Sequence, residues 1–372
     1  MASRKGRAGG NVSPTRKPAR AEPREALVNE AVPRERVAIG VVGAGKIAER
    51  HVLAYKQLGV TDLYLFDVDP VVRAARSTEW QVEAVDDLDT LLGLPGIAAV
   101  DVCTPTSFHA PYAIRALEAR KHVFCEKPLC LSTREGKEIE AAATAACRIV
   151  MVGYLYRFHP AFQFVKSLLE ERTIGDPYLA LVRLGGRGSA AAWKHTVGQG
   201  AGAMGEMMAH MIDLATWYFG SIDEVDPLWN ATLLPSREIG SEVVPASAED
   251  ISIVRLRAGE VQILVESDLA TPSYMQHIDI QGSNGSIFSS ILHYLPTVVY
   301  CKEQRGIYGA GNSVYTFQQE NLFVDELGYF LDAIAGAPHT VNLLQDSMHI
   351  VEVLERIQGM TASHYPPSEA VH

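Results

Sequence analysis

The stretch that decides the fold is Val37-Ala38-Ile39-Gly40-Val41-Val42-Gly43-Ala44-Gly45-Lys46-Ile47-Ala48. Its first six residues form a continuous apolar run, which is typical of a strand buried on both faces of a parallel sheet. The segment from Gly43 to Ala48 has the pattern G-x-G-x-x-A and comes directly before a helix expected over 46–58. We therefore expect an α/β domain that starts with a strand, a tight glycine turn and a helix.

Strands and helices continue to alternate after this first unit. Further apolar runs predict strands at 63–66, 98–103, 122–125 and 149–152, with helices at 71–77, 87–92, 110–119 and 134–146. Strands separated by helices indicate βαβ units. The first part of the chain therefore predicts a Rossmann fold, a doubly wound parallel sheet.

The pattern changes after Gly153, where strands begin to dominate. Helices are expected at 160–170, 204–218, 320–335 and 343–357, and strands at 251–256, 261–269, 276–281, 286–290 and 298–302. The run Ser283-Asn284-Gly285 between two of these strands is a hairpin signal. The second part therefore predicts an α+β domain with a large, open and mostly antiparallel sheet.

We expect four parts along the 372 residues. Residues 1–35 hold eight Lys or Arg and four Glu, with few apolar groups, and predict a disordered basic tail. Residues 36–156 form the dinucleotide-binding domain, and residues 157–340 form a domain for substrate binding and oligomerisation. Residues 341–372 contribute a helix that packs back near the first domain, followed by a tail.

Charge and composition exclude several classes of function. The net charge is −11, and about −15 without the basic tail, which argues against nucleic acid as a partner. The apolar runs are too short for a membrane span, and the chain does not start like a secretory signal. Five cysteines without zinc-ligand spacing indicate free thiols in the cytoplasm, and no metal site is expected.

The glycine loop predicts a dinucleotide site. Gly43 permits the tight turn, Gly45 lets the backbone approach a pyrophosphate, and Ala48 allows close packing of helix and strand. Asp67 follows the second strand, 22 residues after Gly45, where a carboxylate accepts hydrogen bonds from ribose hydroxyls and repels a 2′-phosphate. No basic residue directly follows it, so NAD is favoured over NADP.

Two later motifs identify a family. Val123-Phe124-Cys125-Glu126-Lys127-Pro128-Leu129 carries Glu-Lys-Pro, and Cys103-Thr104-Pro105-Thr106-Ser107-Phe108-His109 precedes it. Together with the glycine loop, they resemble the glucose–fructose oxidoreductase and inositol dehydrogenase (Gfo/Idh/MocA) family. The resemblance implies a catalytic lysine, Lys127, followed by an unusual, cis peptide bond to Pro128. The expected cofactor-binding residues are Gly43, Ala44, Gly45, Lys46, Ile47, Asp67, Thr104, Pro105, Thr106, His109, Glu126 and Lys127.

A second cluster lies on the helix expected over 204–218. The segment 200–213 resembles the family pattern G-G-G-x-x-x-D-x-G-x-H-x-x-D, and helical spacing puts Glu206, His210 and Asp213 on one face. A histidine flanked by carboxylates suits removal of a hydroxyl proton, so His210 and Glu206 join Lys127 as expected catalytic residues. Glu206 and Met208 replace the family's aspartate and glycine, so the substrate cannot be inherited. Expected substrate-binding residues are Tyr154, Arg157, Trp193, Lys194, Glu206, His210 and Asp213.

The resulting hypothesis is an NAD-dependent dehydrogenase or reductase that acts on a hydroxyl or keto carbon of a sugar, cyclitol or similar small polar molecule. Two alternatives stay open: a hydrolase or eliminase that oxidises transiently and keeps its NAD, and a non-catalytic NAD-binding regulator. The family resemblance implies a homodimer or homotetramer. The physiological direction of the reaction is not determined by the sequence.

Overall fold

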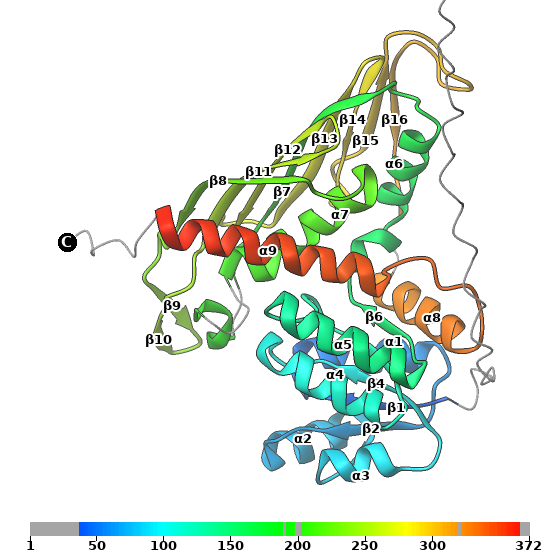
Figure 1. Ribbon diagram of the computed structural model, residues 1–372, viewed down its shortest axis with the longest axis vertical. Helices are drawn as coiled ribbons and strands as arrows, with labels where there is room; N and C mark the ends of the chain where they lie inside the picture. Colours follow the sequence, from blue (N-terminus) through cyan, green and yellow to red (C-terminus); the bar gives the residue numbers. More distant parts are fainter. Residues whose placement is uncertain (1–36, 189–190, 198–201, 319–320, 365–372) are drawn as a thin grey trace, which may run out of the picture.

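The computed structural model describes residues 37–188, 191–197, 202–318 and 321–364. The expected tail at 1–35 and the last residues of the chain lie outside these ranges, as do the first two residues of the 200–213 motif. Two large sheets organise the described chain, one below the other in Figure 1.

The first sheet has six parallel strands in the order β3-β2-β1-β4-β5-β6. Its strands are β1 (Ala38–Val42), β2 (Leu63–Phe66), β3 (Glu83–Ala84), β4 (Ile97–Val102), β5 (His122–Cys125) and β6 (Val150–Val152). Every residue of β1 is buried, because helices cover both faces of the sheet. The predicted Rossmann fold is therefore confirmed.

Helices cover this sheet in two groups. They are α1 (Lys46–Gln57), α2 (Pro70–Trp80), α3 (Leu88–Gly93), α4 (His109–Glu118) and α5 (Thr133–Ala146). Apolar residues of α1 and α2 belong to one core cluster, and those of α3, α4 and α5 belong to another on the opposite face. The loops between strands and helices thus meet at the carboxyl edge of the sheet.

Helix α8 (Leu322–Ile334) lies on the first domain, not on the second. Its Phe330 and Leu331 are fully buried in the core cluster that contains α1 and β1. The expected boundary at residue 340 assigned this helix to the second domain, and the packing corrects that assignment. Sequence spacing shows that a helix is amphipathic but not which sheet it covers.

The second sheet has eight strands in the order β16-β15-β14-β13-β7-β12-β11-β8. These strands are β7 (Pro177–Gly185), β8 (Glu224–Ala231), β11 (Ile251–Ala258), β12 (Val261–Asp268), β13 (Met275–Gly282), β14 (Gly285–Ser289), β15 (Thr297–Cys301) and β16 (Gly311–Tyr315). A small separate hairpin joins β9 (Ser236–Ile239) to β10 (Glu242–Pro245). All neighbours in the large sheet are antiparallel except β7 and β12, so the mostly antiparallel sheet is confirmed.

Strand β7 is central to this sheet but was not expected from the sequence. Its segment carries apolar residues on both faces, and a short apolar run of this kind does not separate strand from helix. Pairing with both β12 and β13 decides its conformation.

One face of the second sheet is covered by α6 (Pro160–Glu170), α7 (Ala209–Phe219) and the long α9 (Leu344–His364), while no described helix lies on the other face (Figure 1). Helix α9 contacts α5 and β6 of the first domain as well as α7 and β8 of the second. One apolar core cluster therefore continues from the first sheet to the second, and the two domains hold a fixed arrangement around the space between them. No helix in the described ranges is long and apolar enough to cross a membrane.

Candidate functional site

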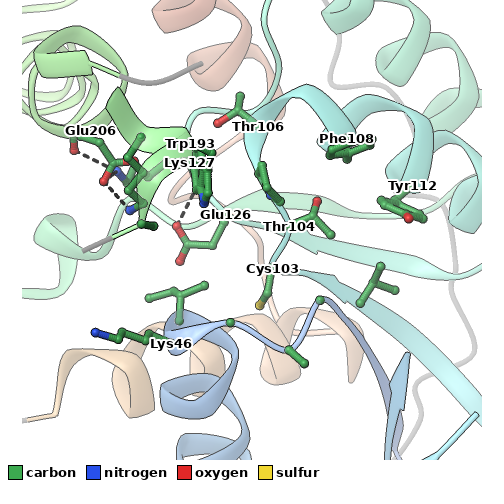
Figure 2. Close-up of a pocket in the computed structure, with 18 of the residues that line it drawn as sticks. Lys46, Cys103, Thr104, Thr106, Phe108, Tyr112, Glu126, Lys127, Trp193 and Glu206 are labelled. Carbon is green, nitrogen blue, oxygen red and sulfur yellow. Dashed lines mark hydrogen bonds and ion pairs between the residues drawn. The ribbon is translucent and has the colours of Figure 1, made fainter. Parts of the chain in front are cut away.

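A cavity of about 770 Å³ lies where the carboxyl edge of the first sheet faces the second domain (Figure 2). This edge is where open parallel sheets bind ligands. The expected site residues that line it are Gly43, Ala44, Gly45, Lys46, Ile47, Asp67, Thr104, Pro105, Thr106, Glu126, Lys127, Trp193, Lys194, Glu206 and His210. Four other expected residues, His109, Tyr154, Arg157 and Asp213, are not part of its lining.

Glycine is required at Gly43 and suits position Gly45 for different physical reasons. Gly43 has φ +98°, and a Cβ built there would lie 2.8 Å from the carbonyl oxygen of Cys103, so the turn itself requires glycine. A Cβ built on Gly45 meets no atom within 4 Å. No side chain caps the N-terminus of α1 at Gly45, so this open space lies beside free backbone N–H groups. These residues fit a dinucleotide pyrophosphate.

Asp67 directly follows β2 and bonds to the glycine loop from the adenosine side. Its Oδ2 accepts the Ala44 N–H at 2.8 Å, and its Oδ1 accepts the Asp69 N–H at 2.9 Å. Arg76 also lines this end of the cavity, although no base was expected here. Its guanidinium is paired with Glu79 at 2.5 Å and lies over the ring of Trp80. The sequence did not single it out because it lies on α2, nine residues beyond Asp67.

Lys127 is held at the opposite end of the cavity, as Figure 2 shows. Its Nζ donates to the backbone carbonyl of Glu206 at 2.8 Å and lies 3.9 Å from the Glu206 carboxylate. Lys194 approaches the same carboxylate to 2.5 Å. Burial lowers the pKa of Lys127, although Glu206 opposes this effect. Burial alone would raise the pKa of Glu206, but the two ammonium groups outweigh it and lower that pKa. An ammonium with a lowered pKa is suited to proton transfer.

His210 faces the cavity without the carboxylate partner that the sequence suggested. Its Nδ1 is buried and has no hydrogen-bond partner within the described chain. Burial, together with the charge of Lys127, lowers its pKa well below the usual value, so the imidazole is neutral. The ring of Tyr156 packs against it with centroids 4.7 Å apart. Neither Glu206 nor Asp213, the carboxylates on either side of it in the motif, bonds to this nitrogen.

Glu206 and His210 do not share one regular α-helix. A π-helical turn covers Met204–Met208, and α7 begins directly after it. The Met204 N–H at the start of this turn donates to the Glu249 carboxylate at 3.0 Å. π-Turns of this kind are frequent at functional sites. The helix expected over 204–218 is otherwise where the sequence placed it.

Arg157, Asp213 and Tyr154 form the wall behind the site. Arg157 is 3% exposed and pairs with Asp213 at 2.7 Å and with Asp346 of α9 at 2.9 Å. Tyr154 is 1% exposed. None of the three side chains is part of the cavity lining, and Arg157 joins three segments of the fold. Their assignment as substrate contacts stays a prediction.

His109 contacts two loops of the site on the side away from the cavity. Its ring nitrogens lie 2.8 Å from the carbonyl oxygens of Pro128 and Thr104, and the side chain is 1% exposed. Both ring nitrogens thus lie beside backbone carbonyls, and the side chain is not part of the cavity lining. Its expected role in cofactor binding stays a prediction. The Lys127–Pro128 peptide bond is cis, as the family resemblance implies.

Several lining residues were missed by the sequence interpretation. Tyr156 and Tyr274 share a hydrogen bond of 2.5 Å between their hydroxyls, across 118 residues of sequence. Phe108 and Tyr112 lie together away from Lys127 and Trp193 in Figure 2. Phe323 comes from α8. Phe108 belongs to the motif from Cys103 to His109, but nothing in the sequence points to Tyr274 or Phe323.

A trio below the cavity has the side chains of a metal site. His51, Asp101 and Cys103 are the residues of the described chain whose ligand atoms lie within 4.8 Å of one another. These atoms already bond to one another: His51 Nδ1 lies 2.9 Å from Asp101, and the Cys103 thiol donates to Asp101 at 3.3 Å. The arrangement needs no ion to satisfy its polar groups.

Comparisons with known proteins agree with this geometry. Residues 37–154 match the family model "Oxidoreductase family, NAD-binding Rossmann fold", and residues 162–288 match the GFO/IDH/MocA C-terminal domain. Myo-inositol 2-dehydrogenase of Thermotoga maritima is 28% identical over 310 residues, which is 82% of this chain and 90% of the relative. Inositol 2-dehydrogenase of Acidothermus cellulolyticus is 30% identical over 68% of this chain and 72% of its own length.

The fold also matches solved structures. A levoglucosan dehydrogenase in complex with NADH superposes with a TM-score of 0.79 at 22% identity, over 88% of this chain and 97% of the other. The glycine cradle, Asp67 and Glu126-Lys127-Pro128 occupy the edge where such a cofactor lies in a Rossmann fold. The chain belongs to the Gfo/Idh/MocA oxidoreductase family and is an NAD-binding enzyme.

Proposed function

We propose that this protein is an NAD-dependent dehydrogenase that transfers a hydride between the nicotinamide and a CH–OH carbon of a sugar or cyclitol. The observation that carries this proposal is the meeting of Lys127, Glu206 and a neutral His210 at one end of the cavity. The curated relatives named as inositol 2-dehydrogenases support the substrate class. Bound NAD supplies the hydride acceptor.

Two side chains are suited to handle the hydroxyl proton. Lys127 presents an ammonium that donates to the developing alkoxide, and its lowered pKa makes the proton easier to move. His210 lines the cavity and is neutral, so its ring is in the form that accepts a proton at physiological pH.

Glu206, Lys194 and Trp193 supply the substrate contacts. The carboxylate of Glu206 accepts hydrogen bonds from sugar hydroxyls, and Lys194 keeps it ionised and in place. The Lys194 ammonium also lies 5.3 Å from the centre of the Trp193 ring, which offers a flat apolar surface beside the charged pair. Such a surface, next to polar groups, suits the mixed character of a carbohydrate.

The test is turnover with a panel of sugars and cyclitols that includes myo-inositol and levoglucosan. NADH absorbance and product mass are followed together for wild type, Lys127→Met and His210→Asn, with the exposed Lys137→Met as a matched control. NADH formed by wild type and the control, but lost in both site variants, supports the proposal. Product without net NADH supports a hydrolase or eliminase that retains its NAD. Tight NAD binding without turnover on any compound contradicts an enzymatic role on this class.

We also propose that the protein assembles as a homodimer or homotetramer through the uncovered face of the second sheet. Leu181, Trp229, Tyr300 and Val314 are at least 38% exposed and lie on this face. Light scattering of wild type and Leu181→Glu tests the assembly: a monomeric wild type contradicts it.

The acidic body of the chain favours a small polar substrate, not nucleic acid, and the free cysteines support a cytoplasmic location.

A further inference from the structure

A fully buried histidine connects the Glu-Lys-Pro motif to the core of the first domain. His51 of α1 lies between Asp101 of β4 and Glu126, which follows β5. Its Nδ1 is 2.9 Å from Asp101 Oδ2, and its Nε2 is 3.2 Å from Glu126 Oε1. The other oxygen of Glu126 accepts the Lys127 N–H at 3.1 Å. A chain of contacts thus runs from Asp101 to the backbone of the catalytic lysine.

The charges of this chain follow from its neighbours. Burial alone would lower the pKa of His51, but Asp101 outweighs it and raises that pKa well above the usual value. The imidazolium in turn holds the pKa of Glu126 at about 2, against the effect of burial. Glu326 of α8 also faces the group, and burial raises its pKa well above the usual value, so it stays protonated. Tyr55 and Cys103 contribute neutral groups. Glu126 is therefore a carboxylate at every physiological pH.

Glu126 presents its negative charge to the end of the cavity that would hold the nicotinamide ring. Its side chain is 13% exposed and lines the cavity beside Thr104, Pro105 and Lys127. The glycine loop fits the pyrophosphate, and Asp67 lies on the adenosine side. The remaining end, where Glu126, Lys127 and His210 lie, is left for the nicotinamide ring.

We propose that Glu126 makes the protein bind NAD⁺ in preference to NADH, and that His51 and Asp101 are positioning residues that keep Glu126 ionised and aimed at the cavity. The oxidised nicotinamide ring carries a positive charge and the reduced ring carries none, so a fixed carboxylate stabilises the oxidised form selectively. The effect lowers the fraction of sites that NADH occupies when both forms of the cofactor are present. It depends on NAD binding but not on the identity of the substrate.

The experiment compares dissociation constants without substrate. NAD⁺ binding is measured by calorimetry and NADH binding by fluorescence, from pH 5 to pH 9, for wild type, Glu126→Gln and His51→Gln. Glu126→Gln keeps the shape and the acceptor for Lys127 N–H but removes the charge. We expect it to lower the preference for NAD⁺ about tenfold at every pH, which is a modest value for one charge pair in a partly buried site.

His51→Gln gives a different signature. Without the imidazolium the Glu126 carboxyl takes up a proton at a higher pH, so the preference for NAD⁺ persists at pH 9 and disappears towards pH 5. Wild type keeps a constant preference over the same range. Asp101→Asn serves as a second variant with the same expected direction if His51→Gln does not fold.

Glu79→Gln is the matched control, because it removes a carboxylate at the adenosine end and changes both dissociation constants equally. The proposal is overturned if Glu126→Gln weakens NAD⁺ and NADH by the same factor, or if it leaves their ratio unchanged. Because no substrate is present, an error in the proposed substrate class does not affect this outcome.

Discussion

The two ends of the cavity are built in different ways. At the adenosine and pyrophosphate end, five consecutive residues from Gly43 to Ile47 line the wall, and no side chain caps the backbone N–H groups that begin α1. At the end proposed for nicotinamide and substrate, Lys127 donates to the backbone carbonyl of Glu206 across 79 residues, and Lys194 donates to the Glu206 carboxylate from a third segment. A local motif specifies the first end. The second end exists only when two domains and several loops have packed, and its groups owe their pKa values to that packing.

The largest expected effect is on catalysis, at the end of the cavity where Lys127 and Glu206 meet. His210→Asn removes the neutral imidazole that accepts the proton, and we expect kcat to fall about 10³-fold, within the usual range for general acid–base catalysis. The NAD dissociation constant should change less than about threefold, because the glycine loop and Asp67, which fit the pyrophosphate and the ribose, are unchanged. Steady-state kinetics and calorimetry measure the two quantities. The exposed His293→Asn is the control, and a kcat within twofold of wild type for His210→Asn would falsify the assignment.

A smaller effect is expected behind the packed end. Arg157→Met leaves the buried Asp213 unpaired, and we expect it to lower the free energy of unfolding by about 3 kcal/mol. The same change at Arg134, in an exposed pair with Glu138, should alter the free energy by less than about 0.5 kcal/mol. Urea denaturation measures both. If Arg157→Met instead raises KM strongly at unchanged stability, Arg157 contacts substrate after all.

At the glycine-loop end of the cavity, one glycine is needed for stability and the other for NAD binding. Gly43→Ala places a Cβ against the Cys103 carbonyl at φ +98°, and we expect a loss of about 2 kcal/mol in stability. Gly45→Val fills open space, so stability should stay within about 0.5 kcal/mol, while the NAD dissociation constant rises about 30-fold. Thermal unfolding and calorimetry distinguish the two variants. Equal loss of stability in both would contradict the distinction.

The smallest effect concerns the start of the π-helical turn that carries Glu206. Burial raises the pKa of Glu249 to about 7, so the folded state keeps a proton that the unfolded state releases. Wild-type stability is therefore full below about pH 4.5 and falls as the pH rises towards 7. Glu249→Gln should match wild type near pH 4 and exceed its free energy of unfolding by about 1 kcal/mol at pH 8, because the side chain is partly exposed. Urea denaturation at both pH values checks this, and the exposed Glu242→Gln is the control. A constant difference between pH 4 and pH 8 would contradict the assignment.

The sequence predicted much of the fold, and its errors have physical causes. The parallel sheet follows from local apolar runs between helices, and α6 begins and ends where expected. Strand β7 was missed because its pattern becomes a strand only through its neighbours β12 and β13. Helix α8 was assigned to the wrong domain, because amphipathicity does not name the surface that a helix covers.

The residues of the candidate site also fall into those that local motifs predicted and those that depend on packing. Motif residues such as Thr104 and Lys127 line the cavity as expected, whereas Arg157 and Asp213 turned inward to pair with each other. Spacing along a helix shows which side chains share a face of that helix. Whether that face meets solvent, the cavity or the core depends on segments from elsewhere in the chain. Tyr274 became part of the lining because β7 and β13 pair, which no local pattern reveals.

The sequence by itself determined the cofactor and the fold of the first domain, and it predicts which lysine is catalytic. These depend on backbone turns and on residue types at short spacing, which neighbouring residues specify. Only the tertiary structure decided which charged groups meet: Lys127 with Glu206, Lys194 with the same carboxylate, and His51 between Asp101 and Glu126. The reason is that Coulomb interactions and burial depend on distances in space, and these distances are set by packing between segments far apart in the chain.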